Sequence, residues 1–262
     1  MSLWAEGRLS GGAILGETGT SLIRSAVACA SQSVGFAEDF QSLGDNMEDS
    51  AGDMRTLTGV NLTKLAGECP PGDALAPYQA RIRQWATEYL VAPHADLGRA
   101  GPVCPYSAAS ISKETFWVGC ADRADLTAND VEEIVADMIP VFHGLPPVDG
   151  PDAVVKSILI LFPQITDYSI IDEAQRCLKE KSIPAGLMIG QFYPGCEEPG
   201  VRNSEFRPLQ SPIPLLAIRY MVGSDFPFLA PKTRWVEEYL KKFAPSVPPA
   251  VRTTIAAQFQ ER

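Results

Sequence analysis

Four segments of the chain repeat apolar residues at the spacing of an amphipathic helix. They are residues 76–91, 127–142, 170–178 and 235–243. Thr127, with Asp130 three residues later, resembles a capping box that opens the second segment, and Pro140 is expected to kink or end it. Lysines close the third segment, where they favour a helix C-terminus. The pattern therefore predicts four helices.

Four other segments have the composition of β-strands, with β-branched and aliphatic residues and little polar interruption. They are residues 115–120, 154–162, 187–192 and 215–221. Strands and helices alternate along the chain until a long polar loop separates the last two strands. This order predicts an α+β or α/β arrangement, and we expect an α+β fold in which a single mixed sheet packs against helices.

The first part of the chain differs from the rest. Residues 1–75 are rich in Gly, Ser and Asp, and their apolar residues show only weak periodicity. We therefore expect residues 1–75 to form an irregular, variable and partly disordered leader. Residues 76–262 are expected to form a single α+β domain.

Composition limits the partners and the compartment. Lys and Arg number 22 against 32 Asp and Glu, a net charge of −10 that would repel the phosphates of a nucleic acid. The longest apolar runs are far short of the roughly 20 residues of a membrane span, and charged residues interrupt any N-terminal signal sequence. Six scattered cysteines without a CxxC motif are expected to be reduced thiols. A cytoplasmic protein without nucleic-acid or membrane partners is expected.

A loop rich in glycine and proline, residues 93–106, holds four candidate catalytic residues: His94, Arg99, Cys104 and Tyr106. His94 can ligate a metal or haem iron, or act as a general base, because the pKa of histidine lies near neutrality. Cys104 can bind haem iron or act as a nucleophile, and the positive charge of Arg99 can favour its thiolate. The alternatives are a His94 that braces the loop and a Cys104 that is a small buried apolar residue.

A second candidate region surrounds the long loop 193–212. Its candidate substrate-binding residues are Gln191, Tyr193, Asn203, Arg207 and Arg219. Arg207 and Arg219 can clamp a carboxylate with paired hydrogen bonds, which would suit an amino-acid substrate. The alternative is a charged loop in solvent, although Arg219 lies in an apolar run and needs a partner. We expect this loop and loop 93–106 to line one pocket.

These two regions resemble a bacterial family of unknown function. Its loop reads His-x-x-Leu-Gly-Arg-x-Gly-x-Val-Cys-Pro-aromatic, here His94 to Tyr106, and its later stretch reads Phe-Arg-Pro-Leu-x-Ser-Pro-x-Pro-x-Leu-Ala-Ile-Arg, here Phe206 to Arg219. The resemblance covers roughly residues 76–245. More loosely, the loop and the α+β body resemble small haem-dependent oxygenases that hydroxylate amino-acid nitrogens. That resemblance implies a haem cofactor with His94 or Cys104 as the iron ligand.

Three functional hypotheses follow. The first is an oxidative, haem-dependent enzyme of bacterial specialised metabolism that acts on an amino acid or amine, with His94 favoured as the ligand. The second is a non-catalytic protein that binds a small molecule and accompanies biosynthetic enzymes. The third is a cofactor-free enzyme with Cys104 as nucleophile and His94 as base.

Overall fold

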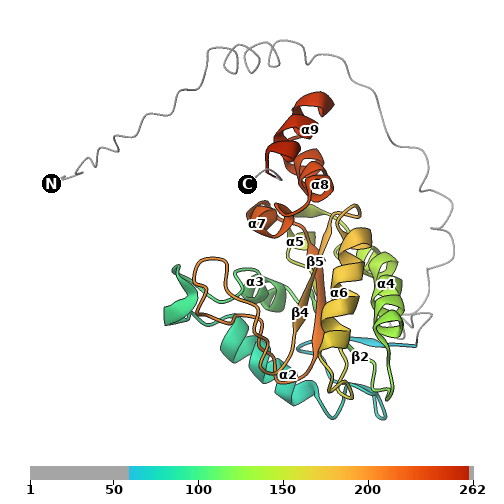
Figure 1. Ribbon diagram of the computed structural model, residues 1–262. Helices are drawn as coiled ribbons and strands as arrows, with labels where there is room; N and C mark the ends of the chain where they lie inside the picture. Colours follow the sequence, from blue (N-terminus) through green and yellow to red (C-terminus); the bar gives the residue numbers. More distant parts are fainter. Residues whose placement is uncertain (1–58, 260–262) are drawn as a thin grey trace.

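The computed structural model describes residues 59–259, and its centre is one mixed five-stranded sheet (Figure 1). The strands are β1 (Leu62–Lys64), β2 (Phe116–Cys120), β3 (Ser157–Leu161), β4 (Leu187–Phe192) and β5 (Leu215–Tyr220). Their order across the sheet is β1-β2-β3-β5-β4. Only β2 and β3 run parallel, and the other three neighbouring pairs are antiparallel. The predicted α+β fold with a single mixed sheet is confirmed.

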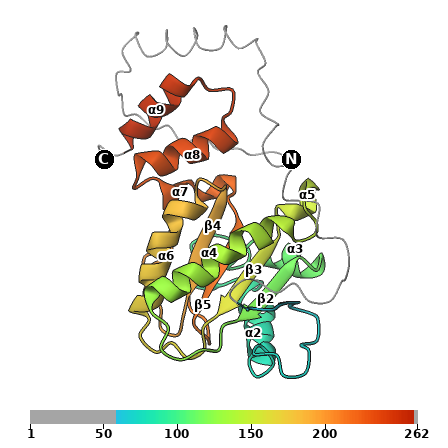
Figure 2. The same ribbon diagram turned by 90° about the vertical axis from the view of Figure 1, so that its right-hand side faces the viewer.

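Two long helices, α4 (Ala128–Gly144) and α6 (Ser169–Ser182), cover one face of this sheet (Figure 2). The predicted capping box opens α4, because Thr127 Oγ1 accepts a hydrogen bond from Asp130 N and the Asp130 carboxylate accepts one from Thr127 N. Of the two outcomes expected at Pro140, the helix does not end there, since α4 continues to Gly144. Proline has no N–H group, so one backbone carbonyl in the preceding turn is left unpaired, and because Pro140 is exposed, water can hydrate this carbonyl. The buried Phe142 holds the following turn against the sheet.

The opposite face is only partly covered by helices. The helix α2 (Gln79–Trp85) continues as one π-helical turn, η1 (Ala86–Leu90), and packs on the sheet with Trp85 edge-on against Phe192, their ring centroids 5.5 Å apart. Loop 93–106 follows, with a short 3-10 turn η2 (Ala95–Leu97), and then the short helix α3 (Ser107–Ser112). Loop 193–212 lies on the same side (Figure 1). This uneven cover leaves room above part of the sheet.

Shorter elements complete the domain. They are α5 (Gly150–Ala153), η3 (Gly223–Asp225), α7 (Phe226–Leu229), α8 (Thr233–Phe243) and α9 (Pro249–Gln258). The sequence predicts α8 but not the others, because elements of three or four residues are too short to show a hydrophobic period. In α9, only Ala256 is buried, so its apolar stripe is weak. Among the described residues, no helix has both the length and the apolar character needed to cross a membrane.

The boundary of the domain lies earlier than the sequence suggests. Residues 59–75, assigned above to the leader, belong to the folded body, since β1 pairs with β2 and Val60, Leu65 and Leu75 are buried in its cores. A three-residue edge strand has no detectable alternation of its own and depends on the pairing partner for its order. The remainder of the predicted leader, residues 1–58, lies outside the described residues.

Candidate functional site

A cavity of about 660 Å³ lies between the partly covered face of the sheet and the two loops. This volume is in the range of sites that hold small organic molecules. Residues of loop 93–106, of loop 193–212 and of α3 form its walls, and side chains of β2, β3, β4 and β5 form its floor. The prediction that the two loops line one pocket therefore agrees with the geometry.

Small side chains on the central strands create the space. The strand register aligns Leu159, Ala217 and Gly190 in one row across β3, β5 and β4, and Ala217 and Gly190 add almost no volume above the sheet. Two residues further along the strands, the next row on this face contains Leu215 and Phe192. These two large side chains fill the space beneath α2. The alternation of side chains along a strand directs both rows to the same face. The cavity therefore begins where the large side chains stop.

Backbone hydrogen bonds hold loop 93–106 at its base. Cys104 N donates to Leu90 O at 2.8 Å, and Val103 N donates to Ala92 O at 2.9 Å, so the loop returns to η1 directly before the cavity. Pro105 then leads the chain into α3. The Cys104 side chain is half-buried and lines the cavity. Its position is thus set by main-chain contacts on a short, stiff segment.

The two loops also contact each other directly. Asn203 Nδ2 donates to Asp96 O at 2.7 Å. Gly98 has a φ of 71°, and a Cβ atom there would lie 3.0 Å from Arg202 O. Glycine at position 98 thus permits both the left-handed backbone and the close approach of the second loop. This contact closes the outer wall of the cavity.

The charged residues of the lining are mostly basic, although the chain carries a net charge of −10. The lining contains five basic residues and two acidic ones: Arg99, Lys156, Lys179, Arg202, Arg219, Glu198 and Asp225. The guanidinium group of Arg99 donates to the carbonyls of Ala100 and Val103, both at 3.1 Å, and makes no ion pair with any described carboxylate. Arg202 is exposed and has neither an ion pair nor a side-chain hydrogen bond within residues 59–259. A low-dielectric cleft with this excess of positive charge attracts anions.

Arg219 forms a bidentate ion pair at the edge of the cavity. Its Nη1 and Nη2 atoms donate to Asp225 Oδ2 at 2.7 Å and Oδ1 at 2.6 Å, and Nη1 also donates to Tyr220 O at 3.0 Å. The Arg219 side chain is 29% exposed and that of Asp225 is 2% exposed. Burial disfavours the guanidinium charge, but the adjacent Asp225 carboxylate outweighs burial and the pKa of Arg219 is raised. The partner that the sequence required for Arg219 is therefore Asp225.

Tyr106 stands beside this ion pair. Its ring centroid lies 5.8 Å from the guanidinium carbon of Arg219, close enough for a cation-π contact. Its hydroxyl is 3.3 Å from Ser224 Oγ. Of the four predicted catalytic residues, Arg99, Cys104 and Tyr106 thus line the cavity, together with Gln191 from the predicted substrate-binding set.

Four predicted site residues do not line the cavity: His94, Tyr193, Asn203 and Arg207. The exposed His94 packs its ring against Phe206, 4.5 Å between centroids, and its Nδ1 accepts a hydrogen bond from Asp96 N at 3.2 Å. Tyr193 donates to Asp172 Oδ2 at 2.9 Å on α6. Arg207 donates to the carbonyls of Ser204 and Phe206 in its own loop. These contacts brace the two loops, which is the alternative that the sequence left open for His94.

Lys156 is a fully buried lysine directly before β3. Its Nζ donates to Leu145 O at 2.5 Å and Pro147 O at 3.2 Å, and it lies 5.0 Å from the ring centroid of Phe142. Burial lowers the pKa of Lys156 to about 8. The ammonium group ties the segment after α4 to the sheet, so its contacts are explained by the structure of the domain.

Sequence reasoning missed Asp225 and left Arg202 out of the candidate set. Asp225 lies six residues after Arg219 in a short turn without periodicity, and only the folded chain brings its carboxylate to the guanidinium group. Arg202 is one of several charges in a polar loop, and no local signal separates it from its neighbours. Among residues 59–259, no group of three or more His, Cys, Asp or Glu residues is arranged to hold a metal ion.

Comparison with known proteins identifies a family. A family model described as "Domain of unknown function (DUF6875)" matches residues 79–254. The expectation of a family of unknown function is confirmed, and the matched range overlaps the residues 76–245 of the sequence resemblance. No curated protein and no solved structure matches the chain.

Proposed function

We propose that this chain, which belongs to the family described as domain of unknown function DUF6875, binds a small organic acid in its central cavity. An amino acid is the first candidate. The observation that carries this proposal is the excess of basic residues in the lining of a chain that is acidic as a whole. A carboxylate in the cavity would gain the attraction of Arg99 and Arg202, which have no carboxylate partner among the described residues.

The apolar part of the lining suits the remainder of such a ligand. Leu90, Leu97, Phe116 and Leu159 present apolar surface in the same cavity. Sites for small molecules commonly combine apolar walls with a few polar groups that fix orientation. Arg219 is less suited to hold the ligand alone, because Asp225 already occupies two of its nitrogen atoms.

Calorimetry with a panel of amino acids and other small carboxylates tests the proposal. Ala217→Leu adds three carbon atoms to the floor of the cavity and should abolish binding. Ala108→Leu is the matched control, because Ala108 is exposed on α3 and outside the lining. A panel in which no acid binds wild-type protein, or an Ala217→Leu variant that binds as well as wild type, would overturn the proposal.

A second pair of variants tests the role of charge. Arg202→Gln should weaken carboxylate binding about tenfold or more, since a hydrogen bond between charged groups contributes roughly 1.5–3 kcal/mol. Arg207→Gln is the control on the same loop, because Arg207 faces carbonyls of its own loop and does not line the cavity. Equal loss in both variants would mean that the loop, and not the cavity charge, controls binding.

Haem-dependent oxidation of the bound amino acid is the reaction that we propose to test first. Cys104 fits a haem ligand better than His94 does, because it lines the cavity and His94 does not. When bound there, haem would supply the oxidative chemistry, and Cys104 would hold the iron. A cytoplasmic location belongs to the same proposal.

Visible absorption of protein produced with haem supplied tests this reaction class. A Soret band that shifts or disappears in Cys104→Ala and persists in His94→Ala is expected. The opposite result would assign the ligand to His94. Absence of any band, with carboxylate binding intact, would leave the non-catalytic binding protein or a cofactor-free Cys104 enzyme, which turnover of the bound acid would separate.

A further inference from the structure

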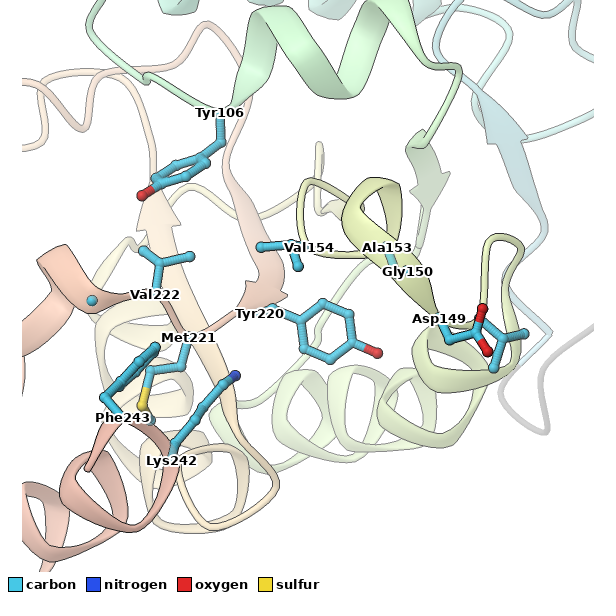
Figure 3. Close-up of a pocket in the computed structure, with 12 residues that line it drawn as sticks. Tyr106, Asp149, Gly150, Ala153, Val154, Tyr220, Met221, Val222, Lys242 and Phe243 are labelled. Atoms are coloured by element: carbon cyan, nitrogen blue, oxygen red, sulfur yellow. The ribbon is translucent and has the colours of Figure 1, made fainter. Parts of the chain in front are cut away.

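A second cavity, of about 500 Å³, adjoins the central one (Figure 3). It lies between α5, the end of β5 and the end of α8. Tyr220, Lys242 and Phe243 line it, and Asp149 stands at its far side (Figure 3). Neither the sequence motifs nor the proposed function uses this space.

Three residues line both cavities: Tyr106, Val154 and Val222. Figure 3 shows Val154 and Val222 below the Tyr106 ring. The recorded hydrogen bond of the Tyr106 hydroxyl is the 3.3 Å contact to Ser224 Oγ. Rotation of the Tyr106 side chain would break this exposed contact and the cation-π contact with Arg219, each of which contributes only a small free energy, and would join the two spaces.

The second cavity differs from the first in its charge. Among its described lining residues, one is basic, Lys242, and one is acidic, Asp149. Lys242 Nζ donates to Gly186 O at 3.1 Å and lies 5.4 Å from the ring centroid of Tyr220. The positive charge therefore already has partners within the protein, and the cavity lacks the excess of basic residues found in the central one.

The second cavity also has an unusually apolar rim. Val148 is 63% exposed, Val154 is 48% exposed and Phe243 is 40% exposed, and all three belong to its lining. Single exposed apolar residues are common, but a group of them around one hollow marks a place where apolar surface binds. An uncharged, apolar group is the occupant that these side chains favour.

We propose that the ligand of the central cavity is an amphipathic acid whose apolar tail passes Tyr106 and occupies the second cavity. This inference rests on the proposed function, because the central cavity holds the carboxylate. The two cavities share a wall, and their linings change from basic in the first to apolar in the second. The ligand is therefore oriented with its charged end near Arg99 and Arg202 and its tail against Val148 and Phe243. The substrate class is then a medium-chain or aryl-chain acid, with or without a 2-amino group.

A series of straight-chain carboxylates from butanoate to dodecanoate, each with and without a 2-amino group, tests the inference by calorimetry. Affinity should rise about fourfold for each methylene group once the chain reaches the second cavity, because burial of one methylene group contributes about that factor. Val148→Asp places a charge on the rim at an exposed position, where folding tolerates it. It should lower dodecanoate affinity about tenfold or more and leave butanoate affinity unchanged.

Ala108→Asp is the control, because it adds the same charge at an exposed position on α3, outside both linings. If butanoate binds but affinity does not increase with chain length, or if Val148→Asp does not flatten the increase, the inference is overturned and the proposed function stands. If no acid of any length binds, the proposed function fails and the inference fails with it.

Discussion

Replacement of Arg219 by methionine tests the buried ion pair with Asp225. Methionine keeps the apolar stem of the side chain but is shorter than arginine and removes both hydrogen bonds to Asp225. The carboxylate of Asp225 would stay in place, 2% exposed, with one remaining donor, Val222 N, at 2.8 Å. The variant therefore leaves a buried charge without its counter-ion.

The expected cost follows from the burial of the two partners. Removing one member of a buried ion pair typically destabilises a protein by about 3–5 kcal/mol. The Arg219 side chain is 29% exposed to the cavity, so water can reach the vacated space and solvate Asp225 in part. We expect the lower end of the range, about 3 kcal/mol, which for a domain of this size is a fall in Tm of roughly 6–12 °C.

Urea unfolding followed by tryptophan fluorescence measures this cost, and a double-mutant cycle isolates the pair. In Arg219→Met with Asp225→Leu, the uncompensated charge is gone, and most of the lost stability should return, because a buried ion pair replaced by apolar residues is often nearly neutral. A single Arg219→Met variant within about 0.5 kcal/mol of wild type would refute the reasoning. Such a result would mean that the ion pair with Asp225 contributes little to the free energy of unfolding.

Three further outcomes are expected. Burial lowers the pKa of Lys156 from the ordinary 10.5 to about 8. Between pH 8 and pH 10.5 the unfolded chain therefore binds more protons than the folded one, and the free energy of unfolding rises with pH. Relative to Lys156→Met, urea unfolding of the wild type should show a gain of about 1.4 kcal/mol per pH unit in this range. A thiol reagent should label Cys104 in native protein and spare the buried Cys120 and Cys196, and a bound acid should protect Cys104; mass spectrometry of the labelled peptides shows which residue reacts. Thr127→Ala should cost about 1 kcal/mol in urea unfolding by removing the cap of α4, and no loss would mean that the capping box does not act in solution.

The main elements of the fold could be predicted from hydrophobic periodicity because their signals are local. The helices α4 and α6 and the strands β2, β4 and β5 lie where the spacing of apolar residues places them, and the capping residue of α4 could be identified as well. The strand that the sequence did not predict has no such local signal. The strand β1 is three residues long and acquires its order by pairing with β2.

The candidate site, like the fold, could be predicted from the sequence only in part. Loop 93–106 could be selected from its proline, glycine and thiol content, and Arg99, Cys104 and Tyr106 do line the cavity. The sequence could not separate these residues from His94, which lies on the same loop but packs against Phe206. Side-chain direction in a loop depends on contacts with distant residues, so spacing alone does not determine it.

The sequence by itself thus determined the α+β class, the central elements and the two loops, since hydrophobic period, capping and backbone restriction act between near neighbours. Only the tertiary structure decided the charge of the cavity, the pairing of Arg219 with Asp225 and the second cavity behind Tyr106. These features depend on the strand register, which aligns Ala217 with Gly190 and brings together residues more than a hundred positions apart. Register is fixed by the packing of the whole sheet and has no local signature in the chain.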